Sequence, residues 1–128
     1  MSLPVVYIAG KFRAAHQWDR EENIRAAEAL ALEVWRRGMV ALCPHTNARN
    51  FDGALPDSVW LEGDIELLRR CDALLTVDNW RDSQGARAEV RFAQVAGIPV
   101  YHTLDALTAC AELAALTKAD GGGGVRHG

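Results

Sequence analysis

The chain has 128 residues, of which 49% are hydrophobic and 24% are charged, and its formal net charge at pH 7 is −3. This length suits one domain and is too short for two domains that each bury a core. The composition excludes a disordered or fibrous chain, and the acidic balance argues against a binder of nucleic-acid polymers or anionic membranes. We expect a single domain over residues 1–118 and a flexible glycine-rich tail over residues 119–128.

The start of the chain and the cysteines favour a reduced, cytoplasmic environment. Residues 1–4 lack the charged start and long apolar core of a secretion signal, and charges interrupt the apolar stretches elsewhere, so no membrane contact is expected. Three widely spaced cysteines in apolar sequence are typical of reduced core thiols rather than of disulfides. Because no Cys/His pair has metal-ligand spacing, we expect neither a metal nor a cofactor. The cysteines are Cys43, Cys71 and Cys110.

The first half of the chain alternates between strand and helix patterns. Residues 5–9 are a short β-branched run, which predicts a strand buried on both faces. A capping box at residues 19–22 predicts the start of a helix, and apolar residues recur at helical spacing from there to Gly38. Residues 39–43 predict a second strand, and residues 44–56 predict a long polar loop.

The second half continues the alternation. The ends of one helix are marked clearly, because Ser83 is a favoured helix N-cap residue and Gly97 is a typical helix terminator. The expected elements are a helix over 57–71 capped by Asp57 or Ser58, a strand over 73–77, a loop over 78–83, a helix over 84–96, a strand over 98–101 and a helix over 103–118.

This order of elements predicts a fold of the α/β class. Strands that alternate with helices at this spacing form a parallel sheet with right-handed crossovers and helices on both faces. We expect a Rossmann-like or flavodoxin-like three-layer sandwich with a mainly parallel sheet of four to five strands. In such folds ligands bind beyond the carboxyl ends of the strands, so the loops after Ala9, Cys43, Val77 and Tyr101 are the places to look for function.

Glu89 stands out by its position on the helix expected over residues 84–96. It shares a stripe with Ala86, Val90 and Ala93, which should face the sheet. A carboxylate buried there without a partner is costly and has a raised pKa. Glu89 could form a structural ion pair, or it could project into the crevice as a nucleophile or general base.

Asp64 falls between Trp60 and Leu67, at the edge of the apolar face of the preceding helix. Alone it could be an ordinary edge carboxylate near Arg69 or Arg70. Two inward-leaning carboxylates on neighbouring helices, however, form the kind of pair that glycosyl chemistry uses. One of them attacks the anomeric carbon, while the other handles protons or orients the nucleophile.

Two short segments could form a local anion site in this acidic protein. The segment Gly10-Lys11-Phe12-Arg13 places two cations beside a backbone turn at the end of the first strand. The segment Ser83-Gln84-Gly85 places a hydroxyl, a glycine and a helix N-terminus beside another strand end. The alternatives are two solvated basic side chains and a serine that only caps its helix.

Three further polar or aromatic residues follow strand ends. His45 and His102 lie where a general acid or a metal ligand could sit, but no third ligand is apparent, so both are interpreted as polar loop groups. His45 is kept as a candidate for contact with substrate. Trp80, in the loop after the third strand, could stack on a base.

Four short motifs follow one another along residues 5–102. They are Val5-Val6-Tyr7-Ile8-Ala9-Gly10, Asp64-(x)7-Asp72-Ala73, Ser83-x-Gly85-x-x-x-Glu89 and Ala96-Gly97-Ile98-Pro99-Val100. In their order and spacing these motifs resemble the nucleoside 2-deoxyribosyltransferase-like superfamily. The chain looks most like a small uncharacterised branch that is similar to the deoxynucleoside 5′-monophosphate N-glycosidases.

The resemblance implies roles for individual residues. Glu89 matches the nucleophile that displaces the base from a 2-deoxyribosyl group, Asp64 matches an aspartate that assists it, and Tyr7 matches an active-site tyrosine. Arg13 and Ser83 match phosphate-binding residues of the N-hydrolase branch, so the resemblance favours a nucleoside 5′-monophosphate as substrate. It also implies a homo-oligomer, because relatives complete their sites across a subunit interface.

Two arginines depart from the family's pattern and keep a second interpretation open. Members commonly have glycines where this chain has Arg87 and Arg91, two residues on either side of Glu89. An ion pair with either arginine would lower the pKa of Glu89, which would then bind charge instead of reacting. The first hypothesis is an enzyme acting on the N-glycosidic bond of a (deoxy)nucleoside or its 5′-monophosphate. The alternative is a non-catalytic nucleotide-binding or sensing module.

Overall fold

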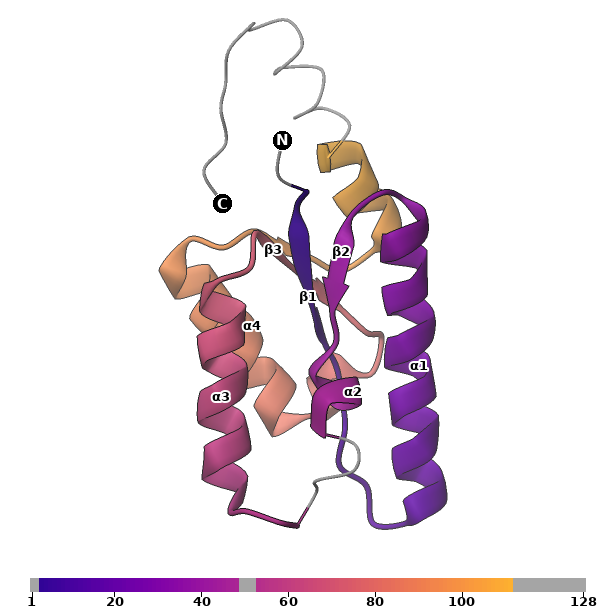
Figure 1. The fold of residues 1–128 in the computed structure, drawn as a ribbon, viewed down its shortest axis with the longest axis vertical. Helices are drawn as coiled ribbons and strands as arrows, with labels where there is room; N and C mark the ends of the chain where they lie inside the picture. The colour runs from indigo at the N-terminus through magenta and orange to yellow at the C-terminus, as the bar shows by residue number, and fades with distance from the viewer. Residues whose placement is uncertain (1–2, 49–52, 112–128) are drawn as a thin grey trace, which may run out of the picture.

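A computed structural model describes residues 3–48 and 53–111 of the chain. Its elements are β1 (Val5–Ala9), α1 (Gln17–Arg36), β2 (Val40–Leu42), α2 (Pro44–Ala48), α3 (Asp57–Arg69), β3 (Ala73–Thr76), the short 3-10 helix η1 (Trp80–Asp82), α4 (Gln84–Ala96) and β4 (Val100–Tyr101). Figure 1 shows the sheet between two layers of helices, with α1 on one side and α3 and α4 on the other. This arrangement confirms the predicted three-layer sandwich.

The sheet has four strands in the order β2-β1-β3-β4, and each neighbouring pair is parallel. β1 lies inside the sheet, where Val6 pairs with Ala73 and Ala9 pairs with Thr76 of β3. Because the strands run in one direction, their carboxyl ends meet at a single edge, at the bottom of Figure 1. The predicted α/β class and parallel sheet are therefore confirmed.

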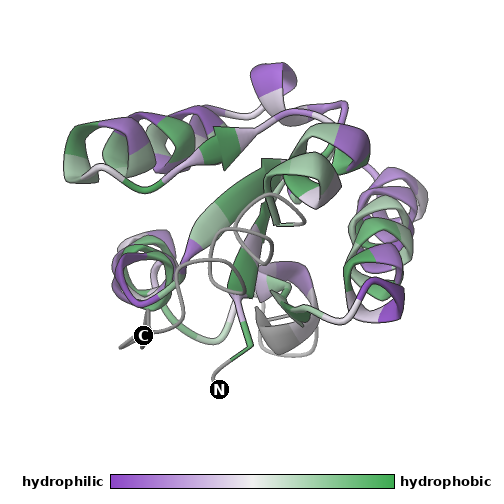
Figure 2. Cartoon of the chain, turned by 90° about the horizontal axis from the view of Figure 1, so that it is seen from above, coloured by the Kyte–Doolittle hydropathy of each residue, from purple (hydrophilic) through white to green (hydrophobic). Residues whose placement is uncertain are grey.

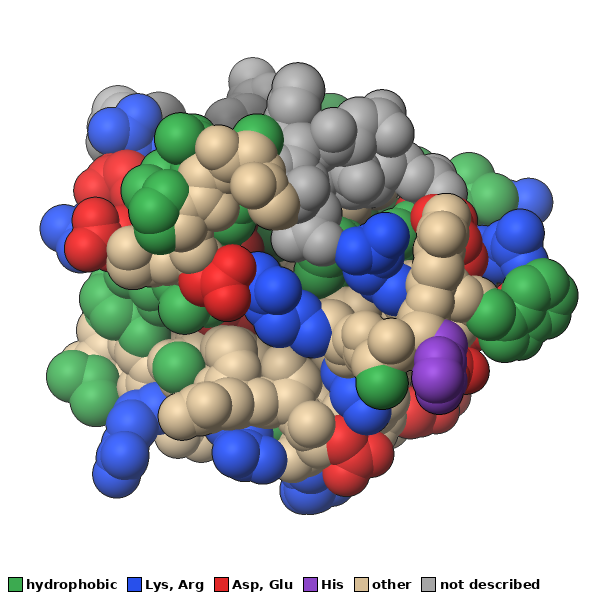
Figure 3. Space-filling model, turned by 90° about the horizontal axis from the view of Figure 1, so that it is seen from below, with side chains coloured by type: hydrophobic (Ala, Val, Ile, Leu, Met, Phe, Trp, Pro, Cys, Tyr) green, Lys and Arg blue, Asp and Glu red, His purple; other side chains and the backbone are tan. Residues whose placement is uncertain are grey.

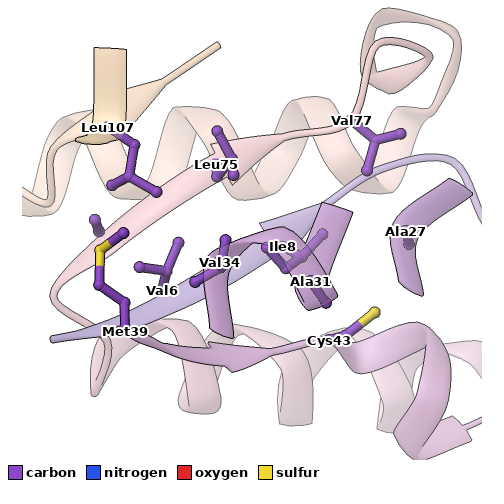
Figure 4. Packing of buried hydrophobic residues seen from close by; sticks show 11 residues of the cluster. Val6, Ile8, Ala27, Ala31, Val34, Met39, Cys43, Leu75, Val77 and Leu107 are labelled. Atoms are coloured by element: carbon purple, nitrogen blue, oxygen red, sulfur yellow. The ribbon is translucent and has the colours of Figure 1, made fainter. Parts of the chain in front are cut away.

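Each face of the sheet has its own apolar core, because successive residues of a strand point to opposite faces. Val6 and Ile8 of β1 pack with residues of α1, in the cluster that Figure 4 shows. Tyr7 and Ala9 belong to a second cluster with residues of α3 and α4. In Figure 2 the strands are largely hydrophobic, whereas the helices carry both hydrophobic and hydrophilic residues. The inner strands are thus buried on both faces, as their composition predicts.

α1 starts earlier than the sequence predicts. It begins at Gln17 rather than at a capping box over residues 19–22, and its N-cap residue, His16, makes no side-chain cap. The Arg20 amide instead bonds to the His16 carbonyl at 3.1 Å, which extends the helix backward. Asp19 then lies in the first turn, where a carboxylate interacts favourably with the helix N-terminus. The capping box is wrong, although the helix itself is confirmed.

The cap predicted for α3 is also wrong. The residue before the helix is Pro56, and Asp57 and Ser58 already lie inside the first turn. No side chain caps this helix end. The Asp57 carboxylate is therefore available for other contacts, and it forms an ion pair with Arg13.

The loop predicted over residues 44–56 contains the short helix α2. Proline is well tolerated at the first position of a helix, because its missing N–H would have no helical partner there, and Pro44 starts α2. The Thr46 amide bonds to the Cys43 carbonyl at 3.1 Å and closes the first turn. As a consequence His45 lies on a helix and is buried, with 5% of its surface exposed.

The edge strands are shorter than predicted. β2 has three residues instead of residues 39–43, and β4 has two instead of residues 98–101. Before β4 the Ile98 amide bonds back to the Ala93 carbonyl of α4 at 2.8 Å, so Ile98 closes the end of that helix instead of pairing in the sheet. Gly97 has φ of +79°, the left-handed conformation that such a helix end requires and that glycine adopts without strain.

The carboxyl-terminal part is described as far as residue 111. The helical residues 104–111 agree with the start of the helix predicted over 103–118. The rest of that helix, the tail over 119–128 and the domain boundary between them lie outside the described residues.

Cys43 and Cys71 are buried and free, but Cys110 is free and exposed, so its prediction as a core thiol is wrong. Between residues 3 and 111, apart from 49–52, no helix has the length and apolar run needed to cross a membrane.

Candidate active site

A cleft of about 570 Å³ opens at the carboxyl edge of the sheet, where the fold class predicts ligand binding. Its walls come from the loop after β1, α2, α3 and the first half of α4. Figure 3 views the molecule from this side and shows acidic and basic side chains next to one another. The cleft brings together most of the predicted site residues, namely Gly10, Lys11, Arg13, His45, Asp64, Ser83, Gly85 and Glu89.

Glu89 projects from the buried face of α4 into this cleft. The fully buried Tyr7 of β1 donates a hydrogen bond from its hydroxyl to Glu89 Oε2. Burial raises the pKa of Glu89 to about 8; the Tyr7 bond opposes this shift, and the nearby Asp64 adds to it. The predicted apolar stripe is confirmed, because the buried residues of α4 are Ala86, Glu89, Val90 and Ala93.

Asp64 lies across the cleft on α3. Burial raises its pKa to about 6, and in the described part of the chain Arg69 and Arg70 make other contacts. Arg70 bonds to Glu66 at 3.1 Å, and the Arg69 guanidinium lies 5.6 Å from the centre of the Phe92 ring. The pKa of Tyr7 is raised well above its usual value by burial first and by the two carboxylates second. Tyr7, Asp64 and Glu89 therefore form one electrostatically coupled group.

Two basic side chains border the cleft on the loop after β1. Arg13 Nη2 lies 2.6 Å from Asp57 Oδ1, and this ion pair links the loop to the first turn of α3. Both side chains are more than half exposed, so the pair contributes only about 0–1 kcal/mol to stability. A more highly charged anion can therefore displace Asp57 from Arg13. Lys11 lines the same wall.

The start of α4 supplies a hydroxyl group to the cleft. Ser83 Oγ accepts a hydrogen bond from the Ala86 amide at 3.1 Å, which confirms Ser83 as the N-cap. A serine hydroxyl also carries one hydrogen that it can donate elsewhere. Capping and anion binding are therefore compatible at Ser83, and Gly85 lies beside it in the lining.

His45 lines the cleft from α2 and holds the backbone of the loop after β1. Its Nε2 lies 2.9 Å from the Lys11 carbonyl oxygen, which can only accept, so Nε2 carries the hydrogen. Burial lowers the pKa of His45, which favours the neutral ring. Contact between His45 and a substrate stays a prediction, while its contact with the loop is a feature of the structure.

Gly10 is placed where the loop leaves β1 in close approach to Val77. A Cβ at Gly10 would lie 2.6 Å from Val77 Cγ2, whereas one at Gly85 would make ordinary contacts with Leu61 Cδ2 at 3.5 Å and Ser83 Oγ at 3.8 Å. We expect Gly10→Ala to lower the free energy of unfolding by about 1–3 kcal/mol, because Val77 must move. Gly85→Ala should leave it unchanged or raise it by up to about 1 kcal/mol. Urea denaturation measures both; equal losses in the two variants would contradict this reading of Gly10.

Trp80 is the one predicted site residue, besides Tyr7, that is not part of the cleft lining among the described residues. Its indole stacks on the His102 ring, with centroids 5.2 Å apart and an interplanar angle of 15°. The Arg81 guanidinium lies 4.8 Å from the centre of the Trp80 ring. His102 Nδ1 in turn lies 2.9 Å from Thr76 Oγ1. The geometry therefore gives no support to stacking of Trp80 on a bound base.

Some residues of the cleft were missed by reasoning from sequence. One face of α3 borders the cleft. Apolar residues of this helix, which periodicity assigns to the core, therefore line the wall of the cleft. An acidic residue in the first turn of a helix is an ordinary N-terminal signal and gives no hint of a site. The missed residues include Asp57, Trp60, Leu61 and Asp82.

Arg87 and Arg91 do not pair with Glu89 in the described ranges. Both are exposed, and Arg87 Nη1 donates to the Arg81 carbonyl at 2.6 Å. Residues two positions apart lie about 200° from one another around a helix axis, which keeps the arginines away from the buried Glu89. The ion pair on which the binding-module interpretation depends is thus absent from this part of the chain. Residues 3–48 and 53–111 also contain no cluster of three potential metal ligands.

Solved structures with this fold include 2-deoxyribosyltransferases. That of Bacillus psychrosaccharolyticus is 19% identical, with a TM-score of 0.55 over 75% of this chain and 69% of that one. That of Leishmania mexicana is 20% identical, with a TM-score of 0.53 over 76% and 61%. A conserved protein from Enterococcus faecalis V583 is 23% identical, with a TM-score of 0.61 over 77% of this chain and 62% of that one. The chain thus spans about three fifths of the last two structures.

These likenesses show that the chain shares the fold of 2-deoxyribosyltransferases. No curated protein matches the chain. A family model matches residues 4–102, and the chain belongs to that family, described as Domain of unknown function (DUF4406). The matched range contains Tyr7, Asp64 and Glu89.

Proposed function

We propose that this protein cleaves or transfers at the N-glycosidic bond of a (deoxy)nucleoside or its 5′-monophosphate. The observation that carries the proposal is the buried Glu89, bonded by Tyr7 and coupled to Asp64 at the wall of the cleft. Paired carboxyl groups of this kind suit an oxocarbenium-like transition state. The fold shared with 2-deoxyribosyltransferases supports the same class of reaction.

Glu89 acts as the nucleophile in this proposal. Its carboxylate oxygen attacks C1′ of the sugar, and the bond from C1′ to the base nitrogen breaks with its electron pair going to the base. The base takes up a proton from Asp64 or from solvent and leaves. Water then attacks C1′ and gives up a proton to the Asp64 carboxylate or to solvent, while the bond from C1′ to Glu89 breaks and restores the carboxylate. If the nitrogen of a second base attacks instead and gives up its proton in the same way, the intermediate gives transfer.

The cations at the mouth of the cleft favour a 5′-monophosphate over a nucleoside. Lys11, Arg13 and the Ser83 hydroxyl line one cavity with Glu89, which suits a sugar with its reacting carbon inside and its phosphate at the mouth. Guanidinium and hydroxyl groups are strong donors to phosphate oxygens. Asp57 forms an ion pair with Arg13, so a phosphate would compete with this carboxylate for the guanidinium.

The proposal is tested by incubating the full chain with ribo- and deoxyribonucleosides and their 5′-monophosphates, with and without a second free base. Free-base release and base exchange are followed by chromatography. We expect release from one class of monophosphate. If no compound is cleaved but some of them raise the melting temperature, the non-catalytic binding module is the correct interpretation.

Removing the Tyr7 hydroxyl should shift the pH dependence of the reaction. Glu89 must be ionised to attack, so with a pKa of about 8 the value of kcat/KM should rise with pH up to that region. The Tyr7 bond lowers the pKa of Glu89. Tyr7→Phe should therefore move the rising limb to higher pH and reduce the rate at neutral pH about tenfold, as the loss of one charge-assisted hydrogen bond predicts. A profile that keeps its position while its height falls would contradict this role for Tyr7.

Releasing Arg13 from Asp57 should strengthen binding of a phosphate. Asp57→Asn removes a carboxylate that competes for the guanidinium, so KM for a nucleoside monophosphate should fall about two- to fivefold, the scale of one exposed ion pair. KM for the corresponding nucleoside, which carries no phosphate, should stay the same. Steady-state kinetics on both substrates measure the difference, and a rise in the monophosphate KM would show that Arg13 does not bind the phosphate.

A further inference from the structure

The backbone of Lys11, in the loop between β1 and α1, forms hydrogen bonds through both its N–H and its C=O with side chains of distant elements. Asn79, in the loop after β3, accepts a hydrogen bond from the Lys11 amide through Oδ1 at 2.9 Å. His45 of α2 donates from Nε2 to the Lys11 carbonyl, also at 2.9 Å. Both backbone polar groups of Lys11, which belong to two successive peptide bonds, are therefore hydrogen-bonded within the protein.

Asn79 is itself oriented by a second asparagine. Its Nδ2 donates to Asn23 Oδ1 at 3.4 Å, and Asn23 Nδ2 donates to the Phe12 carbonyl at 3.3 Å. Asn23 lies on α1, so the chain of bonds runs from the loop after β3 through α1 and back to the loop after β1. Each amide acts once as donor and once as acceptor, which no aliphatic or charged side chain can do.

The start of the same loop is also closely packed against the end of β3 and the residues that follow it. The Val77 amide bonds to the Ala9 carbonyl at 2.8 Å, which carries the β1–β3 pairing up to the loop. A Cβ at Gly10 would meet Asn79 Oδ1 at 3.2 Å as well as Val77. The backbone from Gly10 to Phe12 thus has a defined position before any ligand arrives.

From this geometry we infer that Asn79 is a positioning residue for the anion end of the cleft. The side-chain amide of Asn79 fixes the backbone of Lys11, and thereby the point from which the Lys11 side chain extends, two residues before Arg13. The Lys11 amide is already satisfied, so the loop binds an anion through its charged side chains and not through that backbone N–H. The inference deepens the proposed function and rests on it, because it assigns the geometry of the phosphate end to a residue remote from the reacting atoms.

Hydrogen exchange tests, without any substrate, whether the side chain of Asn79 holds the Lys11 amide; this hydrogen bond is called the clamp below. In Asn79→Ala the Lys11 amide should exchange about tenfold faster than in the wild type, the scale of one lost hydrogen bond. Asn79→Asp keeps an oxygen acceptor for Lys11 and should restore exchange to near the wild-type rate. Gln94→Ala, which removes an amide from an exposed position of α4, is the matched control and should change nothing. Amide-resolved NMR of the full chain gives all four rates.

Kinetics test whether the clamp serves the anion. Asn79→Ala should raise KM for the nucleoside monophosphate about tenfold, leave kcat within about twofold, and leave KM for the nucleoside unchanged. An unchanged Lys11 exchange rate overturns the clamp, and a loss confined to kcat overturns its role in binding the anion. If the wild type cleaves no compound, the proposed function fails by itself, and a titration with inorganic phosphate replaces KM. Binding weakened about tenfold in Asn79→Ala then supports the anion role, and equal binding overturns it.

Discussion

Glu89→Gln should reduce base release by about a thousandfold or more, with little effect on KM, because the variant keeps the shape of the site and lacks the attacking oxygen. The amide oxygen of glutamine can still accept the Tyr7 hydrogen bond, so the pocket should keep its structure. Single-turnover measurements on the monophosphate that the wild type cleaves give the comparison. They report the chemical step separately from product release.

The matched control for this prediction is Glu66→Gln. Glu66 lies on the same helix as Asp64 and pairs with Arg70 on the exposed surface, so its loss should leave the rate unchanged. Asp64→Asn should be slower than the wild type but faster than Glu89→Gln, because in the proposed reaction Asp64 assists without forming the bond to the sugar. A Glu89→Gln variant that retains a tenth or more of the wild-type rate would rule out Glu89 as the nucleophile.

The same substitution should make the protein more stable at neutral and alkaline pH. The pKa of Glu89 is about 8 in the folded protein, whereas the ordinary pKa of a glutamate is 4.5. Between these values the folded state keeps a proton that the unfolded chain releases, so stability falls as pH rises through this window. Glu89→Gln removes that loss and should gain about 3 kcal/mol at pH 7, which is on the order of 10 °C in melting temperature.

The sign of the pH dependence distinguishes this effect from simple repacking. At about pH 4 Glu89 is protonated in both states, so the variant and the wild type should have nearly equal stability there. Glu33→Gln is the matched control, since Glu33 pairs with Arg36 and Arg37 on the surface of α1 and its pKa is lowered. It should not raise the melting temperature at any pH. Equal gains for Glu89→Gln at low and high pH would contradict the raised pKa.

The parts of this protein that sequence reasoning predicted are those with local causes. The run from Val5 to Ala9 is too apolar for anything but a buried strand, and Ser83 and Gly97 delimit α4 at both ends. Glu89 could be identified because a carboxylate in an apolar stripe breaks the pattern. The place of Tyr7 opposite it came from the resemblance, and the structure adds the hydrogen bond.

The parts that could not be predicted depend on contacts between distant segments. Asp57 looked like a helix cap, but its partner is Arg13, 44 positions earlier. Asn79 carries no pattern at all, because its bonds to Lys11 and Asn23 span 68 and 56 positions. His45 looked like a loop residue until Pro44 was seen to start a helix. Sequence patterns identify the buried faces and the ends of helices and strands. Contacts between distant residues form only when the sheet brings their elements together, so no local pattern predicts them.

The central claim, that Glu89 bonds covalently to the sugar, is tested most directly by trapping the intermediate. A nucleoside monophosphate with fluorine at C2′ slows breakdown of the glycosyl ester, so the adduct accumulates for mass spectrometry of the digested protein. We expect the mass of the fluorinated sugar phosphate on the peptide containing Glu89, with one equivalent of base released and no adduct in Glu89→Gln. Turnover of the natural substrate without any adduct, or an adduct on another peptide, would contradict the account.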